Sequence, residues 1–206
     1  MGYNNNVFIN CPFDTEYAPL LRAMLFTVLY LDYKPYISQT ISSAQVRNNQ
    51  IKEHIRSCQF GIHDLSRCHC KHEGDLPRFN MPYELGLDIG SAEFGYSKLR
   101  NKRILILEKE RYYYQKILSD IAGQDIFHHD GNPDIIIKNV RDWFSNNNDS
   151  FVTPYHEIWR AYNLFKEDLF SNYIYQMPED SFNEMIVGDY IKFTRIWISR
   201  FKSIEN

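Results

Sequence analysis

The sequence predicts an α/β domain with a flavodoxin-like, doubly wound parallel sheet of five strands, followed by a C-terminal helical extension. Short apolar runs alternate with longer amphipathic segments, which is typical of a parallel sheet covered by helices. Three of the runs, at 7–10, 60–64 and 103–107, have the apolar character expected of strands buried on both faces. A polar break at residues 146–150 precedes two further helical segments. We therefore expect an α/β domain over residues 1–148 and a helical extension over residues 149–206.

Five segments are the candidate strands, and they occupy residues 7–10, 34–40, 60–65, 103–107 and 125–129. The run at 103–107, Arg-Ile-Leu-Ile-Leu, is the clearest strand pattern in the chain, and the run at 125–129 is the weakest. The runs at 7–10, 60–64 and 103–107 are the most apolar. We expect these three to be neighbouring central strands.

Helical patterns fill the intervals between the strands. They cover residues 15–33, a segment behind an N-cap at Ser42 or Ser43, a helix opened by Pro82, and residues 112–122 and 133–144. Serine is a favoured N-cap residue, and proline is favoured at the first helical position. In the extension, residues 156–175 and 180–202 are the predicted helices, separated by Met177 and Pro178.

The composition indicates a folded protein, because 44% of its 206 residues are hydrophobic and its net charge is only -3. Acidic and basic residues are mixed, without the basic stripe of a nucleic-acid-binding protein. No apolar run is long enough for a bilayer, the N-terminus lacks an export signal, and the four cysteines do not suggest a disulfide framework. We expect a cytoplasmic protein that does not bind membranes, and the sequence gives no strong sign of nucleic-acid binding.

Aromatic residues make up 16% of the chain, and many lie in its last third. Large apolar side chains in such number indicate a stacked helical core or a contact surface. We expect the C-terminal helices to form a homo-oligomer or to bind a partner protein.

The carboxyl ends of the strands are the expected site, because ligands of open parallel sheets bind there. The candidate residues follow the first and third strands or open the next helix: Asn10, Pro12, Phe13, Asp14, Asp64, Ser66, Arg67, Arg78, Asn80, Met81 and Glu84. A carboxylate in a first helical turn is held anionic by the helix dipole, which suits a nucleophile or a partner for an oxocarbenium-like sugar centre. Arg67 and Arg78 would hold a phosphate or a carboxamide.

Each carboxylate also has a structural interpretation. Glu84 would complete a helix cap at its third or fourth position if Asn80 or Met81 is the N-cap. Asp64 at a strand end would form an Asx turn, and Asp14 would cap the first long helix. Gly86 and Gly90, spaced four residues apart, would permit close packing of their helix on the sheet.

Several common sites are missing from the sequence. Neither a Gly-rich phosphate loop nor a serine nucleophile elbow occurs, so we expect no dinucleotide held in the Rossmann manner and no cofactor. Cys68, His69, Cys70 and His72, with Cys58 and His63 elsewhere, raise a zinc hypothesis. A Cys-x-Cys spacing is cramped for one metal ion, and we expect a polar loop without metal. His128 and His129 at a strand end leave the same two alternatives open.

A resemblance to a known group supports the site. The segments Val-Phe-Ile-Asn-Cys-Pro-Phe-Asp at 7–14, Ile-His-Asp-Leu-Ser-Arg at 62–67 and Asn-Met-Pro-Tyr-Glu-Leu-Gly-Leu-Asp-Ile-Gly at 80–90 resemble nucleoside 2-deoxyribosyltransferase-like proteins, relatives of TIR-like domains. The resemblance covers about the first 110 residues and includes the Lys98–Leu107 element. It implies that Glu84 is the nucleophile or sugar-contacting carboxylate, that Asp64 contacts sugar or base, and that Pro12 and Phe13 line the base pocket.

The same resemblance implies cleavage or exchange of N-glycosidic bonds in nucleosides, nucleotides or NAD-like dinucleotides, and some TIR-like relatives act in bacterial antiviral defence. The loop at 78–82 is basic and bulky where the transferases carry an acidic, Gly-containing loop, which argues against ordinary deoxynucleoside exchange. We therefore expect an N-glycosidase or glycosyltransferase with Glu84 and Asp64 as catalytic residues. A non-catalytic nucleotide-sensing module that works through oligomerisation is the alternative.

Overall fold

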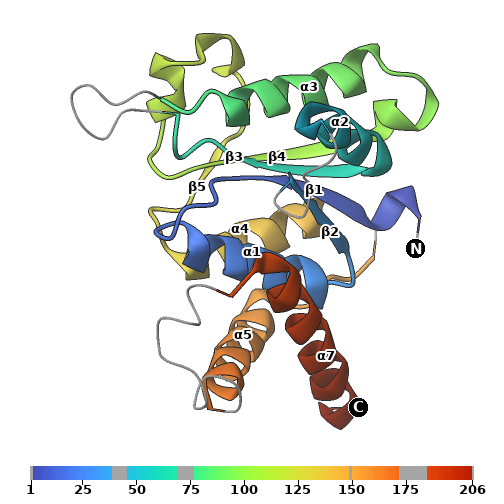
Figure 1. Ribbon diagram of the computed structural model, residues 1–206, viewed down its shortest axis with the longest axis vertical. Coiled ribbons are helices and arrows are strands. Elements are labelled where there is room, and N and C mark those ends of the chain that lie inside the picture. The colour runs from blue at the N-terminus through green and yellow to red at the C-terminus, as the bar shows by residue number, and fades with distance from the viewer. Residues whose placement is uncertain (1, 39–45, 69–76, 149, 172–184, 206) are drawn as a thin grey trace. The chain divides into compact units, whose positions relative to one another are not determined.

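The computed structural model describes residues 2–38, 46–68, 77–148, 150–171 and 185–205. It contains a five-stranded sheet in the order β2-β1-β3-β4-β5, and every neighbouring pair is parallel (Figure 1). The strands are β1 (Asn6–Asn10), β2 (Lys34–Ile37), β3 (Phe60–Asp64), β4 (Arg103–Glu108) and β5 (Phe127–His128). The predicted flavodoxin-like fold is confirmed, with the three most apolar strands as neighbours.

The direction in which the chain adds strands reverses between β1 and β3. From β1 the chain first adds β2 on one side, and it then returns to add β3, β4 and β5 on the other side. This reversal is the point in a doubly wound sheet where ligands characteristically bind. The carboxyl ends of β1 and β3, Asn10 and Asp64, lie at this point.

The helices follow the predicted alternation with shifted ends. They are α1 (Ala18–Tyr30), α2 (Arg47–Ser57), α3 (Asn80–Phe94), α4 (Pro133–Asn146), α5 (Tyr155–Leu169) and α7 (Val187–Glu205). Short 3-10 helices are η1 (Tyr3–Asn5), η3 (Ser97–Asn101), η4 (Tyr113–Lys116) and η5 (Ser119–Ile121). The predicted cap at Ser42 or Ser43 and the predicted helix start at Asp180 lie outside the described residues.

The predicted helix over residues 112–122 is wrong. Tyr112 has a left-handed φ of 63°, and Leu118 has φ -130° and ψ 62°, so neither continues an α-helix. The segment instead forms η4 and η5, two 3-10 turns on either side of Leu118. Apolar spacing alone could not reveal these backbone breaks, because the side-chain pattern is compatible with both structures.

The described chain divides into two compact units. One, which we call the sheet unit, comprises Met1–Phe13 and Tyr33–Asn132, and the other, the helical unit, comprises Asp14–Asp32 and Pro133–Asn206. Helices α1 and α4 therefore group with α5 and α7. The expected division of the chain after residue 148 stays a prediction.

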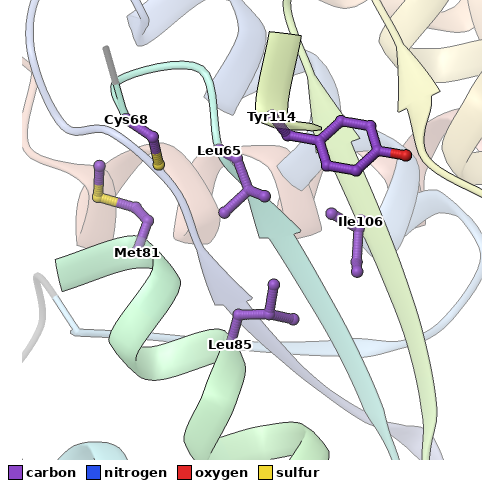
Figure 2. Close-up of a cluster of buried hydrophobic side chains, with 6 residues drawn as sticks. All are labelled: Leu65, Cys68, Met81, Leu85, Ile106 and Tyr114. Carbon is purple, nitrogen blue, oxygen red and sulfur yellow. The ribbon is translucent and has the colours of Figure 1, made fainter. Parts of the chain in front are cut away.

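Within the sheet unit, α2 and α3 lie on the same side of the sheet (Figure 1). Helix α3 buries Met81, Glu84, Leu85 and Asp88, spaced so that they share one face. Figure 2 shows Met81 and Leu85 in a cluster with Leu65, Cys68, Ile106 and Tyr114. This packing fixes the rotation of α3 about its axis and so decides where Glu84 points.

The predicted role of Gly86 and Gly90 in close helix–sheet packing is wrong. A Cβ atom built on Gly86 would meet nothing within 4 Å, and one on Gly90 would meet only the ring of Phe94, at 3.9 Å. The buried face of α3 is formed by the residues around them, so both glycines point away from the sheet.

Aromatic packing holds the helical unit together. The ring of Phe26 in α1 lies 5.3 Å from those of Tyr162 and Phe165 in α5 and 6.0 Å from that of Trp197 in α7. The hydroxyl of Tyr190 donates to the backbone carbonyl of Arg22 at 3.0 Å.

In the segments that the structure describes, no helix has the length and apolar character needed to cross a bilayer.

Candidate functional site

The ends of β1 and of the loop leading into α3 meet at the carboxyl edge of the sheet. Asn10, the last residue of β1, donates from Nδ2 to the backbone carbonyl of Met81 at 2.9 Å. Met81 lies in the first turn of α3, and its side chain belongs to the buried cluster of Figure 2. The structure thus brings together Asn10 and Met81, two residues that the sequence assigns to the site.

Glu84 is buried in α3 with an unsatisfied oxygen. Glu84 is only 4% exposed, and its Oε2 has no hydrogen-bond partner among the described residues. Burial raises the pKa of Glu84 to about 7, and the nearby charge of Arg47 only partly opposes this. A buried carboxyl oxygen without a hydrogen-bond partner is costly, and buried carboxyl groups with shifted pKa values are concentrated at functional sites.

The cap interpretation of Glu84 is not what the structure shows. The N-cap of α3 is Phe79, which makes Glu84 the fifth helical residue, and no side chain caps this helix end. The influence of a helix N-terminus fades beyond the first turn. The expectation that the dipole holds Glu84 anionic is therefore also wrong, because desolvation dominates and favours the protonated carboxyl.

Residues at the start of α2 approach the same part of α3. The amide of Asn48 donates to the hydroxyl of Tyr83 at 3.2 Å, one residue before Glu84. Arg47 donates to the hydroxyl of Ser38, which follows β2, at 3.1 Å. Ser38 thus holds the guanidinium of Arg47 near Glu84. In this position the guanidinium could also attract an anionic ligand.

A buried ionic network includes Asp88, which lies four residues after Glu84 on α3. His63 of β3 contacts Asp88 of α3 through Nε2 and Oδ2 at 2.9 Å, and Lys102 contacts the other oxygen of Asp88 at 3.0 Å. Lys102 also donates to the backbone carbonyls of Ile55 and Cys58. Burial opposes ionisation of Asp88, but His63 and Lys102 together hold its pKa below the usual value. The network therefore contains a charged carboxylate with its counterion, as buried charges require.

Gly61 allows this network to touch the sheet. A Cβ atom at Gly61 would lie 2.2 Å from Oδ2 of Asp88 and 3.1 Å from Nε2 of His63. Such an approach is impossible for any side chain. A glycine inside an apolar strand is a known sign of close approach, and this was the one signal in the sequence that pointed to the network.

Asp64 at the end of β3 has both carboxylate oxygens engaged. Oδ1 accepts the backbone N–H of Ser66 at 2.8 Å, which forms the Asx turn considered from the sequence. Oδ2 lies 3.0 Å from Nε2 of His129, and the Ser66 hydroxyl lies 3.0 Å from the same nitrogen. The backbone N–H of Gly131 donates to Nδ1 of His129, so in the neutral ring the proton is on Nε2.

This arrangement excludes one familiar mechanism. In a Ser-His-Asp triad the carboxylate and the hydroxyl contact opposite ring nitrogens. Here Asp64 and Ser66 share Nε2 of His129, while Nδ1 is occupied by Gly131. His129 therefore orients Asp64 and does not activate Ser66 as a nucleophile.

Glu108 at the end of β4 is a second buried carboxyl that the sequence analysis did not select. It is 3% exposed, and its Oε2 has no partner among the described residues. Burial raises its pKa to about 7, assisted by the charges of Asp64 and Glu110, although the backbone N–H groups of Tyr114 and Tyr113 oppose the rise. An acidic residue directly after the clearest apolar strand was the signal available for it.

The other predicted site residues are less closely gathered. Pro12 is buried, Phe13 and Arg67 are partly exposed, and Arg78 and Asn80 are exposed. Asp14 belongs to the helical unit, where its carboxylate accepts the backbone N–H of Tyr17 at 3.1 Å, next to the start of α1. Contact of these side chains with a ligand stays a prediction.

The zinc hypothesis gains no support from the described residues. No group of three or more His, Cys, Asp or Glu side chains in this part of the chain could hold a metal ion. Burial raises the pKa of the Cys58 and Cys68 thiols to about 12, which disfavours the thiolate needed for binding. His69, Cys70 and His72 lie outside the described residues.

No family model matches the chain, and no curated protein matches it.

The carboxyl edge combines two buried carboxyl groups with pKa values near neutrality. Near pH 7 a group with such a pKa can donate a proton or accept one. The unpartnered oxygens of Glu84 and Glu108 would pair with donors or positive charge on a ligand, and the low-dielectric surroundings would strengthen that interaction.

Proposed function

We propose that the protein is an enzyme that cleaves or transfers the N-glycosidic bond of a nucleotide or NAD-like substrate. The observation that carries the proposal is Glu84, a buried carboxyl with an unpartnered oxygen beside the ends of the central strands. Parallel sheets bind nucleotides at this edge, and glycosidic chemistry depends on a carboxyl facing the sugar.

The properties of Glu84 suit the charge changes of this reaction. When the bond between the anomeric carbon and the base nitrogen breaks, its electron pair leaves with the nitrogen, and positive charge develops on the sugar ring. A carboxylate in a water-excluded site stabilises that charge. Water or an acceptor hydroxyl then bonds to the anomeric carbon and releases its proton.

The raised pKa of Glu84 gives the residue a further use. A neutral base leaves more easily when it is protonated, and a carboxyl with a pKa of about 7 can supply the proton and recover it from the attacking water. A cationic nicotinamide needs no such proton. The positive charge of that substrate would instead lower the pKa of Glu84 and hold it anionic.

A nucleotide-sensing module is the second candidate, and one observation favours it. Asp64, the expected sugar contact, already uses both oxygens on Ser66 and His129. A site in which Asp64 serves only the fold would keep ligand binding without turnover.

The deciding experiment is incubation of the protein with NAD and a panel of nucleotides, followed by chromatography for released base. Glu84→Gln should lower base release by about 100- to 1000-fold or more, because glutamine cannot carry negative charge. Glu93→Gln is the matched control, since Glu93 is an exposed residue of the same helix. Asp64→Asn should weaken substrate binding more than turnover.

The outcomes separate the two candidates. A fully active Glu84→Gln protein would remove the mechanism. Tight nucleotide binding by the wild type without base release, under any tested substrate, would favour the sensing module.

A further inference from the structure

Helix α3 is attached to the sheet on both sides of Glu84 through one histidine. On one side, Asn10 donates from Nδ2 to the carbonyl of Met81 at 2.9 Å and lies 3.0 Å from Nδ1 of His63. On the other side, Nε2 of His63 contacts Oδ2 of Asp88 at 2.9 Å. Met81 precedes Glu84 by three residues and Asp88 follows it by four, so all three positions share the buried face.

The hydrogen-bond directions in this chain of contacts are determined by its ends. The carbonyl of Met81 accepts only, so the atom of Asn10 that approaches it is the amide nitrogen. The same nitrogen then donates its second N–H to Nδ1 of His63, which leaves the proton of the neutral ring on Nε2, facing Asp88. Both amide N–H groups of Asn10 are thus committed to holding α3.

The far end of the chain is equally constrained. Asp88 and His63 have fully buried side chains, and Lys102, also buried, links Asp88 to the carbonyls of Ile55 and Cys58. About 10 Å of helix lies between the two attachments at Met81 and Asp88, at 1.5 Å rise per residue. A helix segment held at both ends cannot rotate or slide without breaking buried polar contacts, each of which is expensive to lose.

We propose that Asn10, His63 and Asp88 are positioning residues that hold the Glu84 carboxyl in its buried location. The inference rests on the proposed function for its catalytic meaning, but the position of Glu84 can be measured without any reaction. Small displacements of a catalytic group are costly, and misplacement by about 1 Å can lower a rate by about 100-fold.

Asn10→Ala and Asn6→Ala form a matched pair for the test. Asn6 is the first residue of β1, is also buried, and donates from Nδ2 to the carbonyl of Ser57 at 2.8 Å, at the end of α2. Both substitutions therefore remove a buried asparagine that holds a helix end to the same strand. Only Asn10→Ala releases the first turn of α3.

The measured quantity is the pKa of Glu84, determined by NMR of carbon-13-labelled glutamate side chains. The Glu84 signal is identified by its absence in Glu84→Gln. Asn10→Ala should lower this pKa by at least about one, toward its ordinary value, because a loosened first turn admits water to the carboxyl. Asn6→Ala should leave the Glu84 pKa unchanged, although both variants should have a lower melting temperature than the wild type. In base release, Asn10→Ala should lower kcat about 10- to 100-fold with little change in KM.

An unchanged Glu84 pKa in Asn10→Ala, or an equal change in Asn6→Ala, would overturn the inference. If Asn10→Ala does not fold, Asn10→Ser retains one donor on a shorter side chain and must move the pKa in the same direction. A wild type without base release would refute the proposed function and leave the pKa comparison intact, so the two failures are distinguishable.

Discussion

Replacing Glu84 with glutamine should make the protein increasingly stable relative to wild type as the pH rises. The pKa of Glu84 is about 7 in the folded protein, against 4.5 for the free side chain. Because the folded state holds the proton to higher pH than the unfolded state, the free energy of unfolding falls as the pH rises from 4.5 to 7. Below that range the carboxyl is protonated in both states and contributes nothing. Glutamine has no proton to lose, so Glu84→Gln removes this loss.

The magnitude follows from linkage. A pKa difference of one corresponds to about 1.4 kcal/mol, so the full effect is about 3 kcal/mol above pH 7, and about 2.5 kcal/mol of it develops between pH 5 and pH 8. For a chain of this size, that is about 5–10 °C in Tm. Any effect of the amide that does not depend on pH cancels in the comparison between the two pH values.

The assay is urea unfolding followed by circular dichroism at pH 5 and pH 8, for the wild type, Glu84→Gln and the exposed control Glu93→Gln. The stability of Glu84→Gln relative to wild type should rise with pH, and that of Glu93→Gln should not. A Glu84→Gln difference that is the same at both pH values would refute a raised pKa, and with it the account of Glu84 as a buried carboxyl with an unpartnered oxygen.

Two further predictions concern buried contacts elsewhere. Lys102→Met should destabilise the protein by about 3–5 kcal/mol in chemical unfolding, because it leaves the buried charge of Asp88 without its cation. The control is the exposed Lys98→Met, which loses a contact of the ammonium with the Tyr3 ring and should cost at most about 1 kcal/mol. Equal effects of the two substitutions would contradict the network. A chain ending at Ser150 should aggregate or lose its oligomeric state in size-exclusion chromatography. The truncation removes the aromatic partners of Phe26 in α5 and α7 and so exposes apolar surface. A soluble truncated chain with an unchanged oligomeric state and melting temperature would argue against this.

Local sequence patterns were sufficient for the sheet. Mainly apolar runs predicted β1, β3 and β4 and their adjacency, because strands buried on both faces are rich in apolar side chains. The rule that ligands bind at the carboxyl ends of strands then selected Asn10, Asp64 and Glu84 without any knowledge of packing. The prediction failed at residues 112–122, where the backbone and not the side-chain pattern ends the helix.

The sequence by itself determined the strands, the fold class and the approximate position of the site, because these depend on patterns within about ten neighbouring residues. Tertiary structure decided the electrostatic state of that site. Asp88 lies 25 residues from His63, and His129 lies 63 residues from Ser66, so these contacts exist only once the strands are in register. Burial itself, which turns Glu84 from an ordinary acid into one with a pKa near 7, is a property of everything packed around the side chain and cannot be read from its neighbours in the chain.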